Sequence, residues 1–281
     1  MRKRRFIQLM CAVLYNCNLT GFYKGRIYQG RLKGVCVPGL NCYSCPGAVT
    51  SCPLGSLQNA LAQSRYQLPY YMLGILLLMG LLLGRFCCGF LCPFGMLQEL
   101  LYKLPVPKAH KNQWTRRASY IKYFVLAILV IVLPLIYSIP AFCKYLCPAG
   151  TLEAGIPLVL TNEPLRKLTG ALFNWKVLVL LICIAGSAVL YRFFCRFLCP
   201  LGAFYSLFQK TAVVGMKVDA DRCIGCGKCV SACKLDVRCV GDHECVDCAE
   251  CQDVCPFQAI SLGIRTDSGK KDKRTQSKSV S

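Results

Sequence analysis

The phrase Cys-Pro-x-Gly occurs four times in this chain, as Cys52-Pro-Leu-Gly, Cys92-Pro-Phe-Gly, Cys147-Pro-Ala-Gly and Cys199-Pro-Leu-Gly. Three of the copies carry a second cysteine four positions earlier, namely Cys88, Cys143 and Cys195. Residues four apart on a helix lie about one turn apart, so the two thiols of such a pair can point to the same side. Proline is favoured at the first position of a helix, where its missing N–H is no loss. The phrase therefore predicts thiol pairs at the start of a new helix.

The composition indicates a metal-binding membrane protein rather than a disulfide-bonded one. The chain has 281 residues, 55% of them hydrophobic, and 23 cysteines. Many of these cysteines are two or three residues apart, a spacing typical of metal clusters. A net charge of +21 is compatible with nucleic-acid binding, but clusters held by thiolates offset part of it. Much of the remaining charge lies at membrane borders and near the C-terminus, so we expect no nucleic-acid partner.

Four uncharged apolar segments predict membrane spans, at residues 6–23, 66–84, 123–143 and 177–191. The predicted fold is mainly α, a four-helix transmembrane bundle with a C-terminal ferredoxin-like α+β domain that holds two [4Fe-4S] clusters. The expected domains are a first span with a cysteine-rich outer loop (1–65), the remaining transmembrane helices (66–210), a cytoplasmic two-cluster ferredoxin-like domain (211–264) and a disordered basic tail (265–281).

The Lys and Arg residues near the spans predict the orientation of the chain. The N-terminus and the second loop together hold eleven of them, whereas the first and third loops together hold eight. Because cytoplasmic loops carry the excess of positive charge, both termini are expected in the cytoplasm of a multi-pass plasma-membrane protein surrounded by lipid. The pairs Cys88/Cys92 and Cys195/Cys199 then lie on the cytoplasmic side, and Cys143/Cys147 lies on the opposite side with the first loop.

The segment after residue 222 carries the most specific motif. Cys223, Cys226, Cys229 and Cys233 follow the C-x2-C-x2-C-x3-C run of bacterial ferredoxins, and Cys245, Cys248, Cys251 and Cys255 repeat it. In that arrangement the fourth cysteine of each run serves the other cluster. The first cluster is therefore predicted on Cys223, Cys226, Cys229 and Cys255, and the second on Cys245, Cys248, Cys251 and Cys233. Zinc is the alternative for paired CxxC elements, but two such runs make it improbable.

Up to two further [4Fe-4S] clusters are predicted from the membrane motifs. We expect an inner membrane-face cluster on Cys88, Cys92, Cys195 and Cys199. The Cys52 copy lacks its partner, because Ala48 stands four positions earlier. An outer cluster is predicted on Cys45, Cys52, Cys143 and Cys147, with Cys36 and Cys42 as alternative ligands. The stretch from residue 47 to 61 is small or apolar and is expected to dip back into the membrane.

Several groups needed for other functions are missing from the sequence. No Asp, Glu, Lys, Arg or His lies in the middle of a predicted span, although pumps, channels and charged-solute transporters normally need one. The two histidines, His110 and His243, lie outside the spans, so a haem with paired histidine ligands inside the membrane is not expected. No nucleotide-binding loop is found, and no catalytic residue is predicted. We expect a redox-active subunit of an oxidoreductase complex rather than a stand-alone enzyme.

The paired CxxxCP phrases at cytoplasmic span ends and the two-cluster tail resemble those of the NapH/NosR-type membrane iron–sulfur proteins. The resemblance covers roughly residues 66–262. It implies that Cys88, Cys92, Cys195 and Cys199 are the cytoplasmic CxxxCP ligands, beside the eight cysteines of the tail. The phrase at Cys143/Cys147 and the first-loop cysteines depart from the plain two-motif pattern. They favour a chain with its own outward-facing cluster, and any flavin or quinone is expected to come with a partner.

The expected function is electron transfer at a membrane. Electrons would pass between a soluble cytoplasmic donor or the quinol pool and an external or membrane redox partner, possibly a flavoprotein, at or beyond the outer face. One alternative is an accessory or assembly factor that reduces a metal or thiol during maturation of another oxidoreductase. Another is a membrane redox sensor that acts through the basic residues after Arg265.

Overall fold

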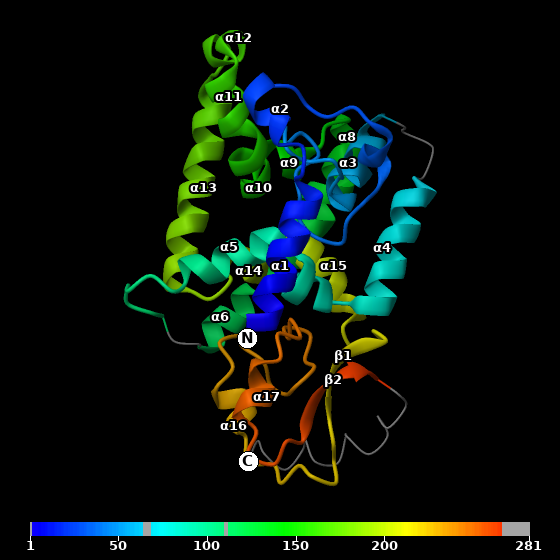
Figure 1. Cartoon of the computed structure of the whole chain (residues 1–281), viewed down its shortest axis with the longest axis vertical. Coiled ribbons are helices and arrows are strands. Elements are labelled where there is room, and N and C mark those ends of the chain that lie inside the picture. The colour runs from blue at the N-terminus through cyan, green and yellow to red at the C-terminus, as the bar shows by residue number, and fades with distance from the viewer. Residues whose placement is uncertain (1, 64–68, 110–111, 266–281) are drawn as a thin grey trace.

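The computed structural model describes residues 2–63, 69–109 and 112–265, and it is mostly helical (Figure 1). The predicted basic tail, residues 266–281, and the start of the second predicted span, residues 66–68, lie outside the described residues. The helices are α1 (Arg2–Tyr15), α2 (Leu19–Lys24), α3 (Pro53–Gln63), α4 (Tyr70–Leu83), α5 (Pro93–Leu101), α6 (Gln113–Ala118), α7 (Ile121–Val125), α8 (Leu133–Tyr137), α9 (Ala141–Tyr145), α10 (Pro148–Gly150), α11 (Ile156–Thr161), α12 (Glu163–Lys167), α13 (Ala171–Val189), α14 (Phe193–Phe197), α15 (Pro200–Phe208), α16 (Lys228–Ser231) and α17 (Glu250–Val254).

Three π-helical segments interrupt this series, at Cys87–Leu91, Leu126–Val132 and Thr151–Gly155. The second joins α7 to α8, so that Gln113–Tyr137 is one helix of 25 residues. The first contains Cys88 and leads directly into the Cys92 phrase. Such π-helical segments are frequent at functional sites, where they redirect side chains within a helix.

Two described helices are long and apolar enough to cross a membrane, Gln113–Tyr137 and α13. These helices correspond to the third and fourth predicted spans. The second predicted span forms α4, whose 14 residues are fewer than a spanning helix needs. The first is divided into α1 and α2 at residues 16–18, where the Asn16 side chain donates to the carbonyl oxygen of Ala12 at 3.0 Å. Asparagine side chains that bond the backbone in this way favour helix ends over helix interiors.

The C-terminal part, from residue 214, forms a small lobe below the helices in Figure 1. Strands β1 (Val214–Val218) and β2 (Ile260–Ile264) pair antiparallel, with Val214 opposite Ile264 and Val218 opposite Ile260. The two cysteine runs and the short helices α16 and α17 lie between these strands in sequence. This arrangement agrees with the predicted ferredoxin-like α+β domain, which we call the tail domain.

Candidate metal centres

All four Cys-Pro-x-Gly phrases begin a helix in the same way. Each proline is the first residue of its helix, in α3, α5, α10 and α15. The cysteine before it caps the helix, and the thiols of Cys147 and Cys199 accept from the backbone N–H of Gly150 at 3.4 Å and of Gly202 at 3.3 Å. The phrase thus fixes the cysteine sulfur over the first turn of a helix, where free N–H groups favour a negatively charged ligand.

The glycine of the phrase also allows close packing between the two cysteines of a pair. A Cβ added at Gly95 would lie 3.1 Å from the carbonyl oxygen of Cys88, and one at Gly202 would lie 3.3 Å from that of Cys195. Both distances are tighter than nearly all real Cβ contacts. A side chain at either position would push apart the two arms that present the thiols.

The inner thiol set, Cys88, Cys92, Cys195 and Cys199, is brought together as one buried group. Cys195 hydrogen-bonds Cys199, and it lies within electrostatic reach of both Cys88 and Cys92. None of the four residues is more than 9% exposed. The two arms come from opposite halves of the chain, as the paired phrases predict.

Two buried glutamines each bond a cysteine of one Cys-x3-Cys pair and the backbone before it. Gln98 donates from Nε2 to the thiol of Cys195 at 3.0 Å, and its Oε1 accepts from the backbone N–H of Phe194 at 3.0 Å. Gln58 makes the same two bonds elsewhere, to the thiol of Cys143 at 3.5 Å and from the N–H of Phe142 at 3.1 Å. Sequence reasoning missed both residues, although each stands six positions after the cysteine of its phrase.

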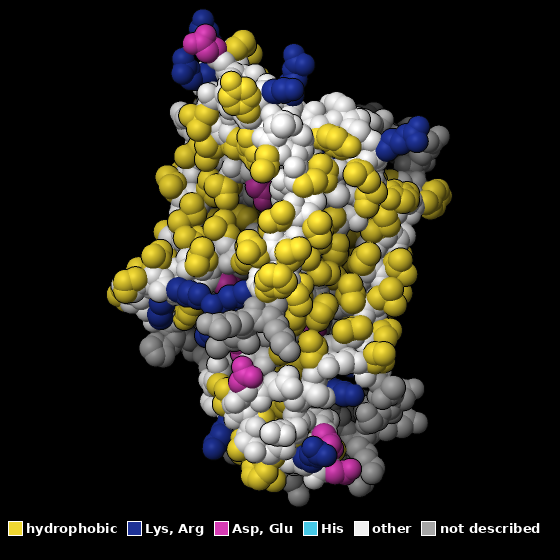
Figure 2. All heavy atoms as spheres, viewed as in Figure 1, with side chains coloured by type: hydrophobic (Ala, Val, Ile, Leu, Met, Phe, Trp, Pro, Cys, Tyr) yellow, Lys and Arg dark blue, Asp and Glu magenta, His cyan; other side chains and the backbone are white. Residues whose placement is uncertain are grey.

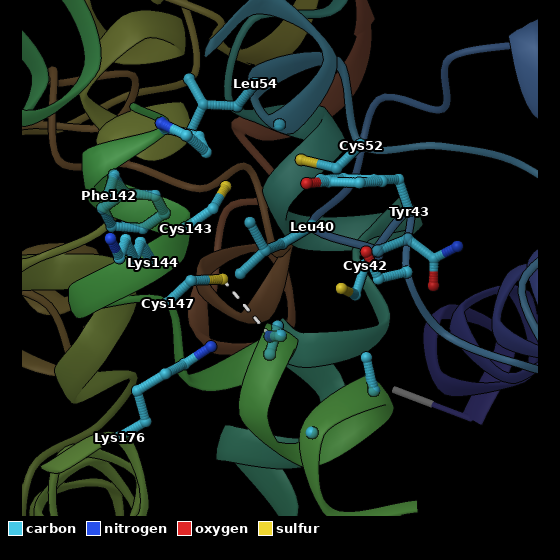
Figure 3. A pocket seen from close by; sticks show the side chains of 18 of the residues that line it. Leu40, Cys42, Tyr43, Cys52, Leu54, Phe142, Cys143, Lys144, Cys147 and Lys176 are labelled. Carbon is cyan, nitrogen blue, oxygen red and sulfur yellow. Dashed lines mark hydrogen bonds between the residues drawn. The ribbon is translucent and has the colours of Figure 1, made fainter. Parts of the chain in front are cut away.

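Cys143, to which Gln58 donates, lines a cavity of about 380 Å³. Its walls carry Cys42, Cys52, Cys143 and Cys147, which we call the outer thiol set. In Figure 3 their sulfur atoms point toward the middle of the cavity, around the side chain of Leu40. A Cβ at Gly150 would lie 3.7 Å from the sulfurs of both Cys42 and Cys147. Four thiols from two arms therefore face one space, as they do in the inner thiol set.

The first-loop cysteines take different places around this cavity. Cys42 lines the cavity, whereas Cys45, which the sequence analysis favoured, is buried at 1% exposure and is not among the lining residues. The thiol of Cys36 lies 3.3 Å from the sulfur of Met72 and 3.5 Å from Ser51 Oγ. The geometry thus presents Cys42 to the cavity, one of the two alternatives left open by the spacing.

Charged side chains are placed at the edge of the outer cavity. Lys144 and Lys176 are among its lining residues, and Lys176 acts electrostatically on the Cys143 thiol. The carboxylate of Glu153 accepts from the backbone N–H of Cys42 at 2.7 Å, which fixes that part of the first loop against the segment after α10. The two lysines supply positive charge beside the outer thiol set.

Two buried carboxylates beside the inner thiol set each pair with two cations. Glu99 accepts from Arg4 at 2.9 and 2.8 Å and from Nε of Arg192 at 3.0 Å. Glu244 pairs with Lys122 at 2.6 Å and with Arg85 at 3.1 Å. The Glu244 group keeps one positive charge in excess, whereas in the Glu99 group Arg4 also pairs with Glu250 at 3.4 Å.

That excess charge acts on the inner thiol set. Burial raises the pKa of the Cys88 thiol, and Arg85, Arg192 and Lys122 act against this rise by favouring the thiolate. The guanidinium of Arg192 also donates to the Cys88 carbonyl oxygen at 2.7 Å. An anionic cluster at this site would be balanced by these fixed cations. In the sequence, Arg85 and Lys122 count only as charges of the second loop. Arg85 and Arg192 each stand three residues before the first cysteine of a pair, Cys88 and Cys195, and this repeated position is the signal by which the two arginines could have been predicted.

In the tail domain, one cavity collects the predicted ligands of the second cluster. Cys233, Cys245, Cys248 and Cys251 all line it, together with Cys229 and Cys239. Burial raises the pKa of the Cys251 thiol to about 12. Metal binding at this cavity therefore has to displace protons, as it does in other thiolate sites.

For the first tail cluster, the structure brings Cys223, Cys226 and Cys229 within electrostatic reach of one another. Burial raises the pKa of the Cys229 thiol, whereas Cys226 is exposed. Cys255 follows α17, at its C-terminal end. This run thus lies closer to solvent than the other three thiol sets.

The donor chemistry fits iron–sulfur clusters at these places. The inner and outer thiol sets each offer four sulfur donors, buried in the inner set and buried or half-buried in the outer set, and four thiolates are the ligation that a cubane cluster requires. Over residues 2–63, 69–109 and 112–265, no three His, Cys, Asp or Glu side chains converge as the ligands of a single metal ion would.

Comparison with known proteins identifies the same cysteine-bearing segments. One family model, described as a 4Fe-4S binding domain, matches residues 67–112, 123–156 and 173–218. A second, also described as a 4Fe-4S binding domain, matches residues 215–235. These segments include the inner thiol set, the Cys143/Cys147 pair and the first tail run. The chain therefore binds [4Fe-4S] clusters.

Three relatives from the curated proteins match over shorter lengths. An uncharacterized protein of Methanocaldococcus jannaschii is 32% identical over 171 residues, 58% of this chain and 64% of its own length. Protein NirI of Paracoccus denitrificans is 34% identical over 126 residues, 41% of this chain and 16% of its own length. The methylamine utilization ferredoxin-type protein MauN of the same organism is 27% identical over 152 residues, 53% of this chain and 48% of its own length. The match thus spans less than two thirds of each relative, and no solved structure matches the chain.

Proposed function

Because the chain is an iron–sulfur protein of the NapH/NosR-like type, we propose that it is a membrane subunit that carries electrons between a cytoplasmic donor and an acceptor at the outer face. Each cluster, when bound, supplies reversible transfer of one electron. The protein supplies four sets of thiols, buries the inner set completely and places buried cations beside it. The names of NirI and MauN, the second a ferredoxin-type protein, support redox partners on either side, with a quinone or a partner's flavin as candidates.

The outer surface of the helices supports a position within the membrane. Large apolar side chains are exposed along α1, α4, the helix Gln113–Tyr137 and α13. Figure 2 shows them covering the middle of the molecule, with Lys and Arg side chains gathered near its upper end and below the helices. A soluble protein rarely leaves such a continuous apolar band uncovered. We therefore assign the four predicted spans to helices in contact with lipid, the shorter ones crossing part of the bilayer, and both termini to the cytoplasm.

The tail domain is docked on the inner thiol set rather than tethered below it. A Cβ at Gly89, the residue after Cys88, would overlap the carbonyl oxygen of Val246, so only glycine allows the contact. Val246 lies between two of the predicted ligands of the second tail cluster, Cys245 and Cys248. The ion pairs of Glu244 cross the same boundary. This contact supports electron exchange between the tail domain and the inner thiol set.

The proposal depends above all on one observation, which is that Gln58 and Gln98 hold the outer and inner thiol sets with the same pair of hydrogen bonds. The outer set is thus built on the plan of the inner one. A glutamine that served only to fill space would not need to hydrogen-bond both a cysteine thiol and the backbone N–H of the residue before that cysteine. We assign the outer cluster to Cys42, Cys52, Cys143 and Cys147, which gives four clusters in the chain.

Iron content and EPR spectra of the purified full-length protein test this proposal. Four cubanes correspond to about sixteen irons, because each holds four. Cys42→Ser should lose about four irons and one EPR signal. Cys45→Ser, its matched control three residues away, should keep both. Wild-type protein that holds iron only in the tail domain would refute the proposal, and loss of the outer signal in Cys45→Ser alone would refute the assignment of Cys42.

A further inference from the structure

Two consecutive backbone amides connect the inner and outer thiol sets. The N–H of Leu40 faces the thiol of Cys92, and the N–H of Asn41 faces the thiol of Cys52. Cys92 belongs to the inner set and Cys52 to the outer set. One residue step, about 3.8 Å between Cα atoms, therefore separates the contacts to the two sets. This is far less than the hydrocarbon core of about 30 Å that two clusters at opposite membrane faces would have to bridge.

At Gly39 the first loop packs closely against the Cys92 phrase of the inner thiol set. A Cβ added at Gly39 would lie 3.1 Å from Cα of Cys92 and 3.2 Å from the carbonyl oxygen of Leu91. The side chain of Leu40 is 3% exposed and lies among the sulfurs of the outer set (Figure 3). The loop thus runs from the wall of the inner site directly into the outer cavity.

A column of aromatic rings makes a second connection. Phe142 precedes Cys143 of the outer set, and Phe194 precedes Cys195 of the inner set. Their ring centroids are 6.4 Å apart. The ring of Phe94, which follows the Cys92-Pro pair, stands edge-on to Phe194 at 5.4 Å. All three rings are at most 4% exposed, so the space between the two sites is dry and closely packed.

We propose that the Gly39–Asn41 segment and the ring column Phe142–Phe194–Phe94 carry electrons directly between the inner and outer thiol sets, with no quinone bound between them. The proposal rests on the function proposed above and specifies its internal route. In the transfer, the reduced cluster at the inner set loses one electron and the oxidised cluster at the outer set gains it. No bond is made or broken and no proton moves. The electron enters from a one-electron donor at the tail domain and leaves to a one-electron acceptor at the outer cavity.

This route also accounts for the Cys52 phrase, which lacks a cysteine four positions earlier. In the inner set, both pairs have the four-residue spacing and lie at helix boundaries. In the outer set, Cys42 stands ten positions before Cys52, on the loop that reaches Cys92. A cysteine at position 48 would not need that loop at all. The displaced ligand is therefore what brings the backbone of residues 39–41 between the two sets.

The test uses quinone-depleted full-length protein in detergent, with iron content, EPR of the doubly reduced state and rapid-freeze kinetics after a pulse of reductant. Wild-type protein should show spin–spin coupling between the inner and outer signals and fast transfer between them. Gly39→Ala should keep both clusters but weaken the coupling, because the added methyl group pushes the loop away from Cys92. Phe194→Leu should slow the transfer by on the order of tenfold or more, as small displacements of reacting groups do elsewhere.

Phe193→Leu is the matched control for the ring column. Phe193 is the neighbour of Phe194, but its ring pairs with Phe197 at 5.3 Å, away from the route. Transfer that is unaffected in Phe194→Leu, or equally slowed in Phe193→Leu, would overturn the proposal. So would transfer that stops on quinone depletion and returns when a quinone is added. A protein without an outer cluster would instead refute the proposed function, and the iron count separates the two failures.

Discussion

Replacing Gly89 by alanine should release the tail domain from the inner thiol set. A Cβ at this position would lie well inside 3.0 Å of the Val246 carbonyl oxygen, a distance that real Cβ atoms essentially never pass. The neighbouring atom belongs to the backbone, so no side chain can swing away to make room. The two backbones must separate by about 1 Å, and overpacking of this kind costs about 1–3 kcal/mol.

A cost of this size shifts the docking equilibrium by roughly 5–150-fold toward the undocked form. Hydrogen exchange measured by mass spectrometry should show it as faster exchange of residues 245–251 in Gly89→Ala. Iron content should stay the same, because Gly89 is not a ligand. The slower delivery of electrons from the tail domain to the inner cluster should appear in the same preparation by rapid-freeze EPR.

Gly74→Ala is the matched control, because Gly74 lies inside α4 and a Cβ there meets nothing within 4 Å. It should leave both exchange and electron delivery unchanged, or add slightly to helix stability. Wild-type exchange rates in Gly89→Ala would refute the docked arrangement. Equal effects of Gly74→Ala and Gly89→Ala would trace the change to the helices in general rather than to this contact.

Three further predictions concern single side chains. Burial opposes ionisation of Glu244, but Arg85 and Lys122 outweigh it and lower its pKa to about 2. Because this pKa is lowered, the ionised Glu244 stabilises docking above about pH 4.5, and the effect is lost as the pH falls toward 2. Glu244→Gln should therefore undock the tail domain at neutral pH. The expected cost is about 3–5 kcal/mol, because two cations are left without their carboxylate. The exposed Glu163→Gln should leave the domain docked, and hydrogen exchange compares the two. Gln98→Leu should lower the reduction potential of the inner cluster in an EPR titration, because an N–H bond to a ligand sulfur is lost, and an unchanged potential would contradict this. Cys233→Ser should remove the second tail cluster whereas Cys239→Ser should spare it, as iron analysis would show, and the reverse result would reassign the ligands.

The sequence alone predicts the structural features that depend on a local motif. The Cys-Pro-x-Gly phrase combines a helix-capping residue, a proline suited to the first turn and a glycine for close approach, and all four copies begin helices as this predicts. The spacing of the tail runs likewise places Cys233 with the second run around one cavity. Each of these inferences needs only geometry within a few residues, so the rest of the fold does not alter it.

Non-local features could not be predicted in this way. The choice between Cys42 and Cys45 depends on how the first loop is folded against Cys92 and Glu153, and no periodicity of that loop records it. The helix break at residues 16–18 shortens a segment that composition alone makes long enough to span. Arg192 directly follows a predicted span, yet it is fully buried against Glu99, because burial of a charge depends on a partner distant in sequence.

The buried cations also bear on the direction in which electrons move. Arg85 and Lys122 leave one positive charge beyond that of Glu244 beside the inner thiol set, and a cation near a cluster favours its more negative, reduced form. The cations of the outer thiol set are Lys144, which is exposed, and Lys176, which is half-buried, so solvent screens them more than the buried cations of the inner set. Burial raises the pKa of Glu153, which faces Cys42, to about 7. A cluster at the inner site is thus expected to have the higher reduction potential of the two. Electron transfer outward then requires an acceptor that withdraws the electron from the outer cluster. A redox titration that found the outer cluster at the higher potential would contradict this ranking of the two sites.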